Sequence, residues 1–414
     1  MREIHMRSIP IQNIYTVHAA TRGMISILLF VGLATAGFVG FNIGGSSTGV
    51  AWGPSVGANV VSKTGAAALM TGFVFLGGWT VGRNVIDTLG GKIVPTSAFS
   101  IEASIVVLTF IGLGMLVANI YGVPVSTSMT AVGAIAGLGL ATQSLEWAVL
   151  GEIAVWWLIS PVVGFWLGSI VGRYVYPYLD RYFALTQSDG SLVTVERSGA
   201  IPTLRRGPGT TTRELVSTVV VFLIACYMSF SAGASNVANA VAPLVGGGLL
   251  EPDMAVILGT ATIGIGSFTI ARRTMESVGN GITDLPLLAA MVVMVIGATI
   301  TTIASAMGIP ISLALSTVMT IVGLGWGRAT RPATATELAR GEIDADVSVD
   351  ALSVETDDEV PAIGEESGED LQGDSDLFDP SVVVRFVAFW IIGPTVATAL
   401  SYGTFVVLPI AGTV

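Results

Sequence analysis

The sequence predicts an all-α, polytopic membrane protein built from two duplicated halves, which we expect to be inverted, with broken or re-entrant helices. Hydrophobic residues make up 52% of the 414 residues and charged residues only 11%, whereas a soluble protein carries about 25% charged residues. Apolar runs reach the length that crosses ~30 Å of hydrocarbon at 1.5 Å per residue. Short sequence blocks also recur in the same order in both halves.

Two kinds of apolar segment alternate along the chain. The long ones are expected to be membrane spans, and they cover 24–41, 65–81, 104–120, 148–171, 215–230, 254–270, 285–306 and 382–410. The shorter ones are rich in Gly and Ser, and they cover 44–61, 123–140, 231–249 and 309–326. We expect these to be half-helices, re-entrant hairpins or discontinuous spans, because irregular backbone at membrane depth needs protein or a wet cavity around it.

Four blocks indicate the duplication. Each block of the first half returns in the second at a nearly constant spacing, which is longer only for the last pair, where an acidic insertion intervenes. The pairs are Gly44–Ser47 with Gly233–Asn236, Arg83–Gly90 with Arg272–Gly279, Pro124–Ser126 with Pro310–Ser312, and Trp157–Pro161 with Trp390–Pro394. Duplicated halves with interrupted helices are typical of secondary transporters, whose substrate site lies where the halves meet.

Six segments follow from this pattern. They are 1–23, an N-terminal segment; 24–172, membrane repeat 1; 173–213, a basic linker; 214–326, membrane repeat 2; 327–381, an acidic loop; and 382–414, the last membrane segment of repeat 2. The linker holds 6 Arg against 3 acidic residues, which predicts a cytoplasmic position. The loop is expected to be disordered because its apolar residues are few and scattered.

Charge and composition exclude several classes of protein. The acidic loop carries 16 acidic and 3 basic residues, so it accounts for the net charge of −11, and no basic surface for nucleic acid is expected. Cys226 is the single cysteine, and His5 and His18 both precede the first apolar run. Neither a disulfide framework nor a thiolate metal site can form. We therefore expect no enzyme and no resident cofactor.

The Gly- and Ser-rich segments offer donors for an anion. Hydroxyls, amides and the N–H groups of broken helix ends can replace the water around an oxyanion without a fixed charge. The alternative is that these small residues only pack helices together. The candidate substrate-binding residues are Ser46, Ser47, Ser126, Thr127, Ser128, Ser235, Asn236, Asn239 and Ser312.

These blocks carry a family resemblance. The segment Gly233–Pro243, reading GASNVANAVAP, resembles the GANDVANAxxP signature of the PiT family of inorganic phosphate transporters. Residues 43–58 are similar to its first-half copy, and Val123–Ser128, reading VPVSTS, resembles its PVSTT block. The resemblance covers nearly all of the chain except the acidic loop. It implies phosphate transport through a multi-pass protein of the cell membrane, in contact with the lipid bilayer.

The chain departs from this family at two aspartates. The signature Asp, which the resemblance implies helps to hold a coupling sodium, is Ser47 in the first copy and Asn236 in the second. A sodium ion can still bind near Ser47 and Asn236 through neutral oxygens, but no carboxylate balances its charge. Sodium and protons both stay open as the coupling ion.

Asp87 and Glu276 are the candidate coupling residues in the matching Arg-containing blocks. The alternative is an ordinary ion pair near a helix end, and the i,i+4 spacing favours a pair between Arg83 and Asp87 and a second between Arg272 and Glu276.

The leading hypothesis is a secondary transporter of inorganic phosphate driven by an ion gradient. One alternative is a permease for sulfate or another oxyanion. A second is a relative that has lost transport and acts as a regulator. The sequence leaves a homo-oligomer open.

Overall fold

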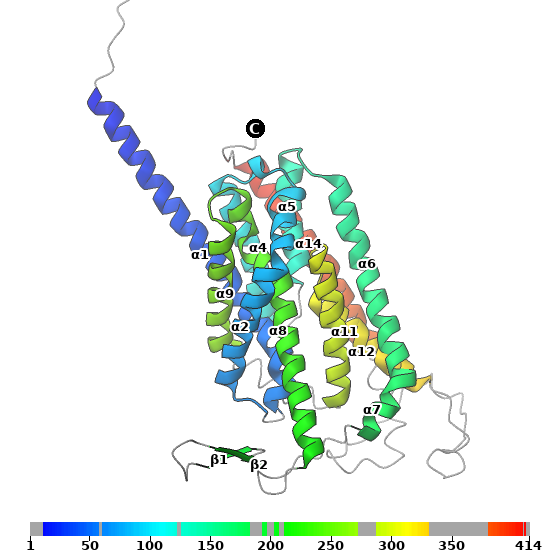
Figure 1. Cartoon of the computed structure of the whole chain (residues 1–414). Coiled ribbons are helices and arrows are strands. Elements are labelled where there is room, and N and C mark those ends of the chain that lie inside the picture. Colours follow the sequence, from blue (N-terminus) through cyan, green and yellow to red (C-terminus); the bar gives the residue numbers. More distant parts are fainter. Residues whose placement is uncertain are drawn as a thin grey trace, which may run out of the picture.

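The protein is a bundle of helices in which one long helix extends beyond the others (Figure 1). The computed structural model describes residues 11–57, 60–121, 126–182, 193–196, 203–206, 211–271, 287–330, 380–408 and 410. The first half contains α1 Ile11–Gly57, α2 Lys63–Thr80, α3 Gly82–Asp87, η1 Thr88–Lys92, η2 Thr96–Ala98, α4 Ile101–Tyr121, α5 Thr127–Ala141 and α6 Trp147–Ile170. The second contains α8 Thr212–Gly246, α9 Pro252–Thr269, α11 Leu287–Ala306, α12 Leu313–Ala329 and α14 Pro380–Val407.

The segment between the halves contains short elements. These are η3 Val171–Val175, α7 Tyr176–Tyr182 and the strands β1 Val193–Glu196 and β2 Thr203–Arg206, which pair antiparallel with each other. Most of the acidic loop, 331–379, lies outside the described residues, as does Glu276. The division of the chain into six segments stays a prediction.

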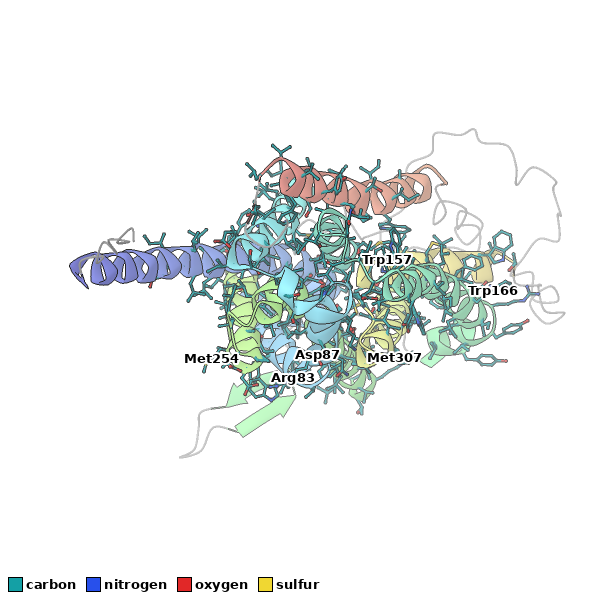
Figure 2. All side chains as sticks on the ribbon, turned by 90° about the horizontal axis from the view of Figure 1, so that it is seen from above. Arg83, Asp87, Trp157, Trp166, Met254 and Met307 are labelled. Atoms are coloured by element: carbon teal, nitrogen blue, oxygen red, sulfur yellow. The ribbon has the colours of Figure 1, made fainter. Side chains whose placement is uncertain are left out.

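The prediction of a multi-pass membrane protein is confirmed. Within the described ranges, five helices are long and apolar enough to span a membrane, and six if one bent pair counts as a span. One face of α6 exposes Leu158 (72%) and Trp166 (59%), and Trp166 lies at the outer edge in Figure 2. Such a surface suits hydrocarbon rather than water.

Helices of one half pack against helices of the other half in two equivalent contacts. Gly77 of α2 lies so close to α8 that a Cβ would overlap the carbonyl oxygen of Phe230. Gly266 of α9 makes the same approach to the carbonyl of Phe41 in α1. Gly266 lies 189 positions after Gly77, and Phe41 lies 189 positions before Phe230. This shift is the spacing of the duplicated blocks. The close approach of α2 to α8 is therefore repeated by α9 and α1.

The short helices α5 and α12 pack in the same way, each against a helix of the other half. Gly137 of α5 faces the carbonyl of Thr398 in α14, where a Cβ would lie 2.6 Å from the oxygen. Gly323 of α12 faces the carbonyl of Phe165 in α6. The two halves are thus duplicated, as predicted. Inversion of the halves stays a prediction. In Figure 1, α1 runs downward from the upper left, whereas α8, its counterpart in the second half, runs upward.

Two of the four expected breaks are wrong. Segment 44–61 continues α1 as far as Gly57, and segment 231–249 continues α8 as far as Gly246. Their glycines serve close helix packing instead, because a Cβ at Gly44 would overlap the carbonyl of Ile263, and one at Gly233 that of Val74. Small residues at helix contacts are the general device for close approach in membranes.

The other two breaks are confirmed. Segments 123–140 and 309–326 contain α5 and α12, helices of 15 and 17 residues that each begin after an N-cap serine with an extended backbone, Ser126 and Ser312. Before α12 the chain turns at Gly308, whose φ of 77° is left-handed and suits glycine. One break was missed, because α2 and the segment Gly82–Lys92 meet at a bend of 62°.

Candidate anion-binding site

The N-terminus of α5 lies inside the protein. Ser126 caps this helix, since its hydroxyl oxygen accepts a hydrogen bond from the N–H of Met129 at 3.2 Å, which is the usual role of an N-cap serine. Ser126, Thr127 and Ser128 are exposed by only 2%, 7% and 2%. The first N–H groups of a helix have no partner within the helix, and its dipole adds positive potential there. This buried helix end therefore suits a negative charge.

Two amides of α8 reach this helix end. The amide nitrogen of Asn239 donates to the hydroxyl oxygen of Ser128 at 3.1 Å and to Oδ1 of Asn236 at 3.3 Å. Asn239 is fully buried and Asn236 is 9% exposed. The structure thus brings three predicted residues into direct contact, although 111 positions separate Ser128 from Asn239.

The end of α4 forms another wall of this region. The hydroxyl of Thr127 donates to the sulfur of Met115 at 3.2 Å. The amide nitrogen of Asn119 lies 3.1 Å from both the backbone and the side-chain oxygen of Asn42 in α1. Asn42 and Asn119 were not predicted. A polar amide within an apolar segment is the signal that could have found them.

The second half has a cap but no matching cluster. The hydroxyl oxygen of Ser312 accepts from the N–H of Leu315 at 3.1 Å and starts α12 as Ser126 starts α5. Leu313 and Ala314 stand where the first half has Thr127 and Ser128. The hydroxyl groups of the predicted site therefore gather on the α5 side.

The remaining predicted serines lie within continuous helices. The hydroxyl of Ser46 donates to the carbonyl of Ile43 at 3.1 Å, and that of Ser235 lies 3.4 Å from the carbonyl of Ala232. Ser47 is half-buried in α1. Because α1 and α8 are unbroken here, the backbone N–H groups beside these serines, and beside Asn236 and Asn239, are occupied within the helix. The expectation that these residues mark a helix end is therefore wrong.

The expected ion pair of Arg83 with Asp87 is also wrong. Arg83 instead binds the carboxylate of Asp253 at 2.8 Å, and Figure 2 shows Arg83 on the same side of the molecule as Met254. Asp87 is exposed at the end of α3. Its coupling role, like that of Glu276, stays a prediction.

The sequence pattern of the phosphate transporter family matches residues 43–401, which include both halves and the α5–α8 contact. The chain belongs to this family. The matched range begins within α1 and ends within α14, so the family pattern covers both duplicated halves and not only the signature blocks.

Two relatives and one solved structure each match at least 70% of this chain. The chain is 28% identical to the sulfate permease CysP of Bacillus subtilis over 70% of this chain and 75% of that protein. It is 25% identical to a protein of Pyrococcus furiosus named as a phosphate permease, over 74% of this chain and 88% of the relative. A solved structure titled "The sodium-dependent phosphate transporter" has a TM-score of 0.65 at 20% identity, covering 93% of this chain and 100% of that one. At that identity it shows the fold.

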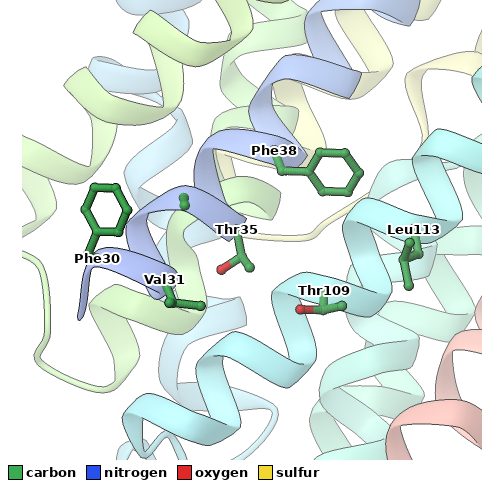
Figure 3. A pocket seen from close by; sticks show the side chains of 7 residues that line it. Phe30, Val31, Thr35, Phe38, Thr109 and Leu113 are labelled. Atoms are coloured by element: carbon green, nitrogen blue, oxygen red, sulfur yellow. The ribbon is translucent and has the colours of Figure 1, made fainter. Parts of the chain in front are cut away.

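One hollow of this member of the phosphate transporter family does not suit an anion. It lies between α1 and α4, has a volume of about 260 Å³ and is lined by Phe30, Phe38 and other apolar side chains (Figure 3). Its two hydroxyls belong to Thr35 and Thr109, which donate to carbonyls of their own helices at 2.9 and 2.7 Å. The hollow therefore offers an anion no free donor.

Proposed function

We propose that the protein is a secondary transporter of inorganic phosphate and that the anion binds at the N-terminus of α5. The observation that supports this most is the buried contact of Asn239 with Ser128 and Asn236. Hydroxyl and amide groups beside a helix N-terminus replace the water of an oxyanion without a permanent countercharge. An anion held this way can also leave again, as transport requires.

The candidate substrate-binding residues have graded roles in this proposal. Ser128, Asn236 and Asn239 form the centre, and Ser126 and Thr127 complete the helix end. Ser312 supplies the equivalent helix end of the second half. Ser46, Ser47 and Ser235 act at most as outer residues, because two of their hydroxyls already have carbonyl partners in their own helices.

The coupling ion is the second part of the proposal. A sodium ion near Ser47 and Asn236 would meet a hydroxyl oxygen and an amide oxygen from those two side chains, which are neutral and bind it more weakly than a carboxylate does. We propose a dependence on sodium that is partial, with protons as the other candidate.

Sulfate is the second candidate substrate, because the sulfate permease of Bacillus subtilis is 28% identical to this chain. Uptake of labelled phosphate and labelled sulfate into proteoliposomes, with sodium and proton gradients imposed separately, distinguishes the two. We expect saturable phosphate uptake driven by at least one gradient. Sulfate uptake without phosphate uptake would replace the substrate, and uptake of neither would overturn transport.

A further inference from the structure

The hydrogen bonds of Asn239 leave one of its atoms unused. Its amide nitrogen has two N–H groups, and the structure provides two acceptors for them, Ser128 and Asn236. Its side-chain oxygen is buried and meets no hydrogen-bond donor among the described residues. Most buried side-chain polar atoms in proteins are paired, and this oxygen belongs to a residue that contacts the buried start of α5, so it can accept from a donor that a ligand brings to that place.

In the structure the amide nitrogen of Asn239 faces Oδ1 of Asn236 at 3.3 Å. With Asn236 in this orientation, turning the amide of Asn239 by half a rotation would place two acceptor oxygens against each other. In the observed orientation the hydroxyl oxygen of Ser128 accepts from Asn239, so its own proton is free to point elsewhere. The pair therefore offers a ligand one donor, on Ser128, and one acceptor, on Asn239.

We propose that Oδ1 of Asn239 accepts a hydrogen bond from the protonated oxygen of the transported anion and so selects phosphate over sulfate. This inference rests on the proposed function. At neutral pH inorganic phosphate carries at least one proton and sulfate carries none. Phosphate satisfies both members of the pair, with an unprotonated oxygen at Ser128 and an O–H group at Asn239. Sulfate leaves the buried acceptor unpaired.

The position equivalent to Asn239 in the first half offers no acceptor. Val50 stands 189 positions before Asn239, at the equivalent place in α1, and its side chain is apolar and 38% exposed. Of these two equivalent positions, only Asn239 can therefore select phosphate over sulfate. Leaving one buried acceptor unpaired weakens binding by roughly ten- to a hundredfold.

The test measures inhibition of labelled phosphate uptake in proteoliposomes containing the full chain. The inhibitors are sulfate, arsenate and selenate, because arsenate is protonated like phosphate whereas selenate, of similar size, is not. We expect arsenate to inhibit at concentrations near those of phosphate, and sulfate and selenate to need roughly ten- to a hundredfold more. Equal inhibition by arsenate and selenate would overturn the proposal without any variant.

The variant Asn239→Leu removes the acceptor at similar volume. The substitution also removes the hydrogen bond to Ser128, which weakens the binding of all four anions alike. The informative quantity is therefore the ratio of the selenate concentration to the arsenate concentration that halves phosphate uptake. We expect this ratio to fall close to one. An unchanged ratio in a variant that still takes up phosphate would show that Asn239 does not read the proton.

The control variant is Ser231→Ala. Ser231 is also buried on α8, and its hydroxyl donates to the carbonyl of Ala298 at 3.0 Å, away from the proposed site. It should keep the full preference for arsenate over selenate. A protein that takes up sulfate but no phosphate would instead refute the proposed function, so the two failures are distinguishable.

Discussion

The indole nitrogen of Trp157 donates a hydrogen bond to the carbonyl oxygen of Pro310 at 2.9 Å, across 153 positions of the chain. Trp157 lies in α6, in the first half, and Pro310 lies in the irregular segment just before α12, in the second. Pro310 lies two residues before Ser312, the N-cap of α12, so its carbonyl oxygen has no partner within that helix. The bond with Trp157 satisfies this carbonyl and fixes the start of α12 against the other half.

Replacing Trp157 with Phe should therefore destabilise the protein. The buried carbonyl of Pro310 loses its donor, which costs roughly 1–3 kcal/mol. The measurement is thermal unfolding in detergent. Trp166→Phe is the matched control, because Trp166 is 59% exposed and the aromatic contact with Phe165 can persist. Equal melting temperatures for the two variants would contradict the role given to this bond.

The serine hydroxyls at the start of α5 should set the affinity for phosphate. Ser128→Ala removes a donor to a buried anion, and such a bond contributes roughly 1.5–3 kcal/mol, so the affinity should fall by about one to two decades. Ser126→Ala should have the same effect on affinity and should also lower stability by about 1 kcal/mol, because Ser126 caps α5. The KM for phosphate uptake and the thermal stability test both statements.

Ser316→Ala is the control for these serine variants. Ser316 is fully buried in α12, and its hydroxyl has no hydrogen-bond partner within the described structure. Its removal should change the KM by less than about twofold, since no bond is lost. Similar small effects of all three substitutions would mean that the serines only pack helices.

Gly44 and Gly233 of the duplicated segments should tolerate substitution far less than Gly72 does. Gly44→Ala and Gly233→Ala each place a methyl group on a backbone carbonyl of the neighbouring helix, which forces α1 from α9 or α2 from α8. We expect little folded protein from either variant. Gly72→Ala, whose Cβ would meet no atom within 4 Å, should fold normally, and size-exclusion profiles in detergent compare the three.

Sodium dependence should increase when the two carboxylates are restored. In the variant Ser47→Asp with Asn236→Asp, the new carboxylate at 236 can still accept from Asn239, as the amide oxygen does now. Two negative charges beside an anion repel it unless a cation binds, so binding of sodium and phosphate becomes linked. Uptake in sodium compared with uptake in choline tests this for both proteins. Complete loss of transport without sodium in the unmodified protein would contradict the expectation of partial dependence.

The sequence by itself determined the fold class, the duplication and the starts of α5 and α12. These depend on local properties, namely hydrophobic length, repeated blocks, and a serine that caps a helix two residues after a proline. The sequence alone also selects Ser128, Asn236 and Asn239 as candidate site residues, because burying a polar group in an apolar segment costs free energy and usually serves a function.

Only the tertiary structure decided how those residues are used. The sequence pattern around Gly44 and Gly233 predicts broken helices, whereas in the structure these glycines permit α1 and α8 to pack closely on their neighbours. A glycine has the same local sequence signal in both cases, and only the position of the neighbouring helix distinguishes them. The contact of Ser128 with Asn239 joins two halves, and no local pattern encodes a distance between halves, because packing sets it.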